Sequence, residues 1–204
     1  SASASTPICR YWPRNAVATP APTSPCEYAP APPPKALCTW PVKYLTMFHM
    51  TNDSHLFKRR DELEAAGFYP VEGNRWRKGQ EDYVPLYEGK MVQAYDHRAA
   101  SIVVNSADLA RHRDVNWLPE PQFWIGQQQI EMPPNIKWAL AFKDVTAPTN
   151  MRTMIAMIVG ASGFGNTLPV LLPDGANGER AYRRFAPLLL ANLNSLVFDF
   201  IARQ

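Results

Sequence analysis

The chain has few of the features that identify a secreted, membrane-spanning or metal-binding protein. No apolar run approaches the ~18 residues that a membrane helix needs, and the small polar start lacks the basic flank and apolar stretch of a signal peptide. The cysteines are odd in number and form no Cys-x-x-Cys pair; they are Cys9, Cys26 and Cys38. We therefore expect reduced thiols in a cytoplasmic protein, without a disulfide framework or a zinc site.

The sequence also lacks a strong charge of either sign. Lysine and arginine number 21 and acidic residues 18, which gives a net charge of +3. Residues 51–113 hold ten basic and ten acidic side chains, so a nucleic-acid-binding face must come from how the charges are arranged in space. The four histidines lack the spacing of metal ligands, and no initiator methionine is present. We expect the 204 residues to be a piece of a longer protein.

Proline is concentrated at the start of the chain. Half of the 20 prolines lie in residues 1–41, including the run Pro30-Ala31-Pro32-Pro33-Pro34. Such a segment forms neither a helix nor a central strand. We expect residues 1–39 to be an extended Pro-rich arm that wraps a partner or the domain surface, with a disordered leader as the alternative.

Residues 40–204 have a globular composition with strands in the middle and helices at both ends. A helix is expected from Asp53 or Ser54 to Ala66, ended by Gly67. A turn at Gly73-Asn74 separates two strand segments, and one or two helices cover 179–203, with an apolar stripe of Leu189, Leu193, Leu196, Val197 and Phe200. Further strands are expected at 83–87, 91–95, 102–104, 123–125, 138–142, 154–159 and 168–172. This order predicts an α+β fold, a mixed or antiparallel sheet with flanking helices.

Two short motifs admit more than one interpretation. Gly160-Ala161-Ser162-Gly163-Phe164-Gly165 follows an apolar strand like a nucleotide-binding loop, but a strand-like segment with two prolines follows it, which favours a tight turn between strands. Glu88-Gly89-Lys90 matches half of a metal-dependent nuclease site, for which Asp61 or Asp82 would have to supply the second carboxylate.

Asp96-His97-Arg98 could suggest acid–base chemistry, but a hydrogen-bonded charged cluster that fixes a turn or contacts phosphate is the plainer interpretation. Basic residues gather in two other short segments, Lys58-Arg59-Arg60 and Arg75-Trp76-Arg77-Lys78. Basic groups next to an aromatic ring suit phosphate contact combined with packing, whereas solvated surface charge is the plainer interpretation. For Lys90, Asp96 and Arg98 a buried ionic network that stabilises the domain is the alternative.

Several segments together resemble the C-terminal target-recognition region of adenine-specific DNA methyltransferases, including type IIG restriction-modification enzymes and phage-defence methylases. The similarity covers about residues 40–204, in the same order, with Lys143 and Met151 as departures from the usual arginine and acidic residue. The segments are Asn52–Phe57, Tyr83–Met91, Tyr95–Arg98, Phe123–Ile125, Trp138–Asp144, Arg152–Ala156 and Leu189–Phe200.

The resemblance implies sequence-specific recognition of double-stranded DNA without catalysis by this segment. In the family a separate catalytic domain of the same parent chain holds S-adenosylmethionine and carries Asn-Pro-Pro-Tyr or Asp-Pro-Pro-Tyr, and neither string occurs here. A metal-dependent nuclease and a protein-interaction module stay as alternatives. The candidate DNA-contacting residues are Lys58, Arg59, Arg75, Arg77, Lys78, Lys90, His97 and Arg98.

Overall fold

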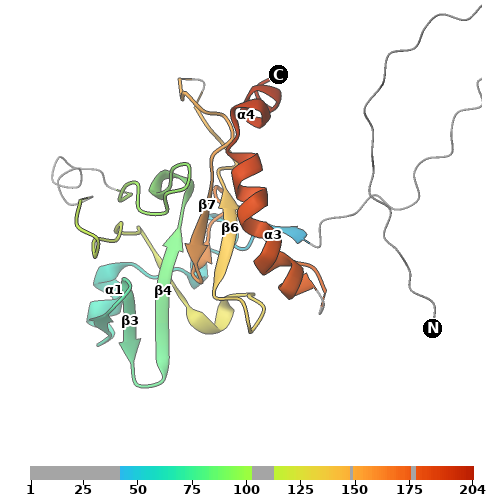
Figure 1. Cartoon of the computed structure of the whole chain (residues 1–204). Helices are drawn as coiled ribbons and strands as arrows, with labels where there is room; N and C mark the ends of the chain where they lie inside the picture. The colour runs from blue at the N-terminus through green and yellow to red at the C-terminus, as the bar shows by residue number, and fades with distance from the viewer. Residues whose placement is uncertain (1–41, 103–112, 148, 176–177) are drawn as a thin grey trace, which may run out of the picture. The chain divides into compact units, whose positions relative to one another are not determined.

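The computed structural model describes residues 42–102, 113–147, 149–175 and 178–204, which fall within one compact unit, Thr39–Gln204 (Figure 1). The predicted Pro-rich arm, the three cysteines and most of the predicted strand 102–104 lie outside the described residues. The described residues form a four-stranded and a five-stranded sheet, and in the second the last residues of strand β4 (Glu81–Tyr87) pair in parallel with the two-residue strand β8 (Gly163–Phe164).

The first sheet has the strand order β1-β9-β6-β7, and all its pairings are antiparallel. Its strands are β1 (Val42–Leu45), β6 (Trp138–Phe142), β7 (Ala156–Gly160) and β9 (Val170–Pro173). Successive side chains of β6 point to opposite faces. Ala139 and Ala141 therefore pack on one face against the buried Met91 and Val92, while Leu140 packs on the other against helix α3 (Gly178–Leu193).

A single tyrosine ties helix α3 to two strands of this sheet. The Tyr182 hydroxyl accepts the Leu140 N–H at 2.8 Å and donates to the Leu171 carbonyl at 2.7 Å. Its ring stacks on Trp138, and burial raises the pKa of Tyr182 to about 12. The hydroxyl therefore stays protonated, so that it can both donate and accept between β6 and β9.

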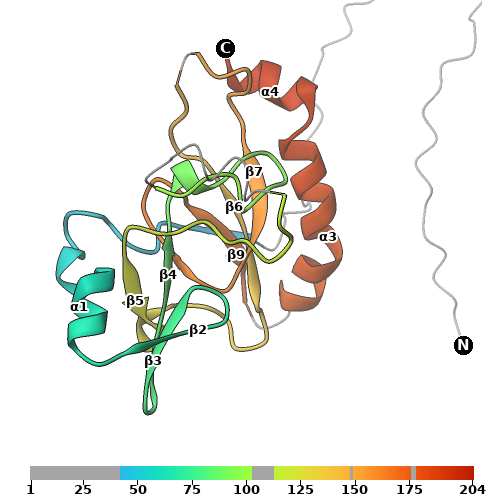
Figure 2. The same ribbon diagram turned by 90° about the vertical axis from the view of Figure 1, so that its left-hand side faces the viewer.

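The second sheet is built around the first half of β4, in the order β2-β3-β4-β5. Its other strands are β2 (Tyr69–Val71), β3 (Arg75–Lys78) and β5 (Trp124–Gly126). Gly73 and Asn74 have positive φ in the turn between β2 and β3, as the Gly-Asn pair predicted. Helix α1 (Arg60–Ala65) buries Leu63 against Trp76 and Trp124, and Figure 2 shows α1 and α3 on opposite sides of the molecule.

The predicted first helix is wrong in its first half. Residues 54–56 form a 3-10 turn, η1 (Ser54–Leu56), and α1 begins only at Arg60. Phe57 is buried in the core, and Lys58 exchanges backbone hydrogen bonds of 2.9 and 2.8 Å with Trp124. These long-range pairings hold the chain extended where the local sequence favours a helix. The predicted stop at Gly67 is confirmed by its φ of 81°.

The predicted apolar stripe at the C-terminus is only half correct. Leu193 is buried and Leu189 packs against the core, but Leu196, Val197 and Phe200 are 75%, 71% and 67% exposed. The chain bends by 67° between α3 and α4 (Leu196–Ala202), so the two helices do not share one face. Among the described residues no single helix is long and apolar enough to cross a membrane; only this bent pair passes, taken together, by length and composition alone.

Two other expectations have opposite outcomes. The strand predicted at 91–95 is wrong. Met91 is the last residue of the 3-10 turn η2 (Gly89–Met91), and an irregular segment follows it. Met91 and Val92 are both buried in the core. The glycine segment 160–165 connects β7 to β8 and opens no helix, which confirms the turn between strands. The predicted α+β class, with antiparallel and mixed sheets and flanking helices, is confirmed.

Candidate nucleic-acid interface

Two arginines of strand β3 are held by one carboxylate. The β3–β4 register places Arg77 opposite Asp82, and Arg75 lies on the same face because residues two apart share a face. Arg77 donates from Nε at 2.6 Å and from Nη2 at 2.8 Å, and Arg75 donates from Nη2 to Asp82 at 2.8 Å. The hydrogen bond from Arg77 holds the pKa of Asp82 below its usual value. Both guanidinium groups are thus fixed at the surface.

The next lysine and the start of α1 complete this basic end of the second sheet. Lys78 Nζ donates to the Ala66 carbonyl at 2.6 Å, at the C-terminal end of α1. Arg59 is exposed, and its guanidinium lies 5.5 Å from the centre of the Phe123 ring. Lys58 is partly exposed beside it. The structure therefore brings five predicted residues onto the second sheet and α1, a set that we call the hairpin group: Lys58, Arg59, Arg75, Arg77 and Lys78.

A hollow of about 700 Å³ is lined in part by two residues of the hairpin group, Arg59 and Arg75. Three tryptophans and three arginines contribute to its lining, and one of these arginines, Arg60, bridges Glu64 and Glu120 at 3.0 Å each. Planar guanidinium groups beside aromatic faces are suited to phosphates and to stacked or edge-on bases. These arginines and tryptophans are Arg59, Arg60, Arg75, Trp76, Trp117 and Trp124.

The other three predicted residues follow the opposite end of β4 in the chain, and of these Arg98 is hydrogen-bonded to Trp117, which lines the hollow. The strand has seven residues, so its two ends are separated by about 20 Å at ~3.3 Å per residue. Arg98 Nη1 donates to three carbonyls of the segment 114–117, of which Val115 is nearest at 2.8 Å. His97 is half-buried, and burial lowers its pKa, so it is neutral at pH 7. Lys90 is exposed.

The geometry gives little support to a nuclease site at Glu88 and Lys90. Asp82 lies at the far end of β4 from Glu88 and is occupied by Arg75 and Arg77. Asp61 lies in the first turn of α1, which packs on the second sheet. Burial raises the pKa of Glu88, with Lys90 opposing the shift. Among the described residues, no group of three His, Cys, Asp or Glu side chains is placed to hold a metal ion.

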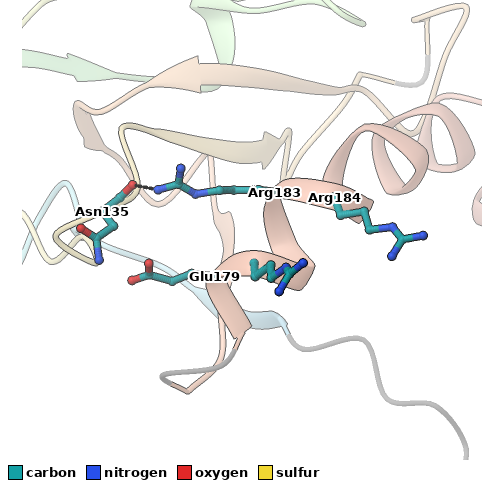
Figure 3. A pocket seen from close by; sticks show the side chains of 5 residues that line it. Asn135, Glu179, Arg183 and Arg184 are labelled. Atoms are coloured by element: carbon teal, nitrogen blue, oxygen red, sulfur yellow. Dashed lines mark hydrogen bonds between the residues drawn. The ribbon is translucent and has the colours of Figure 1, made fainter.

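Sequence reasoning missed an arginine cluster on the first turns of α3. Arg180, Arg183 and Arg184 line a second hollow, of about 610 Å³, together with Glu179 and Asn135 (Figure 3). Arg183 donates to the Asn135 carbonyl. The signal was present in the sequence, because arginines at spacings of three and four share one side of a helix.

The segments that carry the resemblance mostly form the core and its internal hydrogen bonds. Arg152–Ala156 and Leu189–Phe200 meet in space: Asp199 accepts the Thr153 and Met154 N–H groups, both at 2.7 Å, and Arg152 donates to the Asn194 carbonyl. Gly89 lies so close to Thr167 that a Cβ atom would stand 2.9 Å from its carbonyl oxygen. These segments therefore contribute mainly to the packing of this domain.

No family model, curated protein or solved structure matches the chain.

Proposed function

We propose that residues 40–204 bind double-stranded DNA as the target-recognition region of an adenine-specific DNA methyltransferase of a restriction-modification or phage-defence system. The observation that supports this function is the hairpin group, five basic residues of which two, Arg59 and Arg75, line a hollow together with tryptophans. Phosphate contacts from such residues fix register, and side chains that reach base edges select sequence. The methyl donor, S-adenosylmethionine, belongs to a separate catalytic domain in this proposal.

The shared carboxylate suits Arg77 and Arg75 to this role. Arginine has five N–H donors, and Arg77 uses two of them on Asp82, which leaves three N–H groups for an external acceptor. Arg75 is steadied further by Gln127 Oε1 at 2.5 Å. A guanidinium already held in place loses less conformational entropy when it binds a phosphate or a base. Lys58 and Arg59 form no ion pair within the described residues, so their positive charges can contact phosphates directly.

The test is duplex binding by the full chain, measured by fluorescence anisotropy from 50 to 300 mM salt. We expect binding that weakens with salt, and a smaller salt slope for Lys58→Ala with Arg59→Ala, by ~0.9 for each phosphate that is no longer neutralised. Lys43→Ala, on β1 of the other sheet, is the matched control with an unchanged slope. If the wild-type chain ignores duplexes even at low salt, the proposal fails and the protein-interaction alternative gains support.

A further inference from the structure

The arginines of α3 differ from those of the second sheet in having no acidic partner in the part of the chain that the structure describes. Arg180, Arg183 and Arg184 are exposed and form no ion pair within the described residues, whereas Arg60, Arg75 and Arg77 all do. The helix carries three arginines against one acidic residue, a net charge of +2 (3 − 1). These positive charges remain available for an external anion.

The α3 cluster is continuous with the hairpin group through one loop. A third hollow, of about 590 Å³, is lined by Arg75, Gln127 and Lys137 among other residues. Asn135, two residues before Lys137, lines the hollow beside α3 (Figure 3). Figures 1 and 2 both place the loop 127–137 between the β3–β4 hairpin and the first turn of α3. The hollow lined by Arg75 and Lys137 and the hollow beside α3 therefore both lie along one edge of the domain, which the loop 127–137 forms.

We infer that the phosphate backbone of duplex DNA follows this edge, and that α3 supplies a second set of phosphate contacts beyond the hairpin group. We call Arg75, Lys137, Arg180, Arg183 and Arg184 the basic track. Arg180 and Arg184 are separated by about 6 Å along the helix axis and lie on the same side of the helix, so both can contact phosphates of one strand. Glu179 lines the same hollow, and its carboxylate would repel a phosphate there. The inference rests on the proposed function and extends its footprint.

The experiment compares the wild-type chain with a double variant that carries both Arg180→Ala and Arg184→Ala. Arg183 is kept because it holds the loop at Asn135. Removing both phosphate-binding charges lowers the salt slope by ~1.8, which corresponds to about 60-fold weaker duplex binding at 0.1 M salt if both charges neutralise a phosphate fully. The double lysine variant at the same positions keeps the charge, and we expect it to retain the slope.

The possible failures are distinguishable. If the wild-type chain binds duplex and the alanine variant, with unchanged thermal unfolding, keeps both affinity and slope, the α3 contacts are refuted while the proposed function stands. If the wild-type chain binds an acidic peptide but no duplex, both are refuted. A reduced slope in the alanine variant with the wild-type slope in the lysine variant supports the basic track.

Discussion

Replacement of Asn194 by alanine tests how the edge of the first sheet is closed. Asn194 is 3% exposed, and its amide accepts the Ala156 N–H at 3.0 Å and donates to the Ala156 carbonyl at 2.8 Å. Strand β7 is the last in its sheet, so this side chain takes the place of a further strand. The Ala156 carbonyl also accepts the Tyr95 N–H at 3.0 Å, so in the Asn194→Ala variant it keeps one partner and only the Ala156 N–H loses its partner.

The expected destabilisation follows from these two bonds. Leaving a buried N–H without a partner costs about 1–3 kcal/mol, and the second bond contributes about 0.5–1.5 kcal/mol. The free energy of unfolding is therefore expected to fall by about 2–4 kcal/mol, which lowers the melting temperature by roughly 5–15 °C in a domain of this size. Urea unfolding followed by tryptophan fluorescence measures the change.

The matched control is Asn192→Ala, an exposed asparagine in the last turn of α3, two residues before Asn194. It replaces the same side chain without touching β7, so we expect its free energy of unfolding to stay within ~0.5 kcal/mol of the wild type. If Asn194→Ala is no less stable than Asn192→Ala, the reasoning about the sheet edge is refuted.

Three further predictions concern other parts of the molecule. Replacing Arg75 and Arg77 together by alanine is expected to weaken duplex binding and also to lower the melting temperature, because their shared carboxylate loses both partners; an unchanged melting temperature would contradict the ion-pair geometry. Backbone N–H groups hold the pKa of Asp199 below its usual value, so its stabilising effect is present above the unfolded-state pKa and is lost as the pH falls through the lowered one. Urea unfolding from pH 6 to pH 3 should show this loss, and Asp199→Asn should flatten it. Gly89→Ala is expected to cost about 1–3 kcal/mol through overpacking against a carbonyl oxygen, whereas Gly160→Ala, with open space, is expected to be tolerated in the same unfolding assay.

Local pattern was sufficient for most of the strands. The continuous apolar run 138–142 reflects burial on both faces of β6, and the Gly73-Asn74 pair places the β2–β3 turn where two positive φ angles are needed. Both signals are contained within a few neighbouring residues. Such elements can be predicted because their local preference and their tertiary contacts agree.

The errors occur where a distant contact overrides the local preference. Lys58 pairs with Trp124, 66 positions later, and this pairing keeps the helix expected from Asp53 from forming before Arg60. The α4 face is set by Asp199, whose partners lie at 153 and 154. Neither contact leaves a trace in the neighbouring sequence, so periodicity alone could not find it.

For the candidate site, composition gave the basic segments but not their internal partners. The ion pair of Arg77 with Asp82 follows from the hairpin register, which is fixed only when both strands are placed. The arginines of α3 were visible as a charge pattern. Their continuity with Arg75 depends on the course of the loop 127–137, which no local rule specifies.

Helix α4 is attached to the rest of the fold mainly through polar atoms, with Asp199 facing inward and Phe200 facing solvent. Opening such a helix exposes little new hydrocarbon, so its release carries a small heat-capacity change and a small denaturant dependence. We therefore expect its amide hydrogens to exchange by local opening, well before those of β6 and β9. Among the described residues, we expect a protease to cleave α4 before β6 and β9.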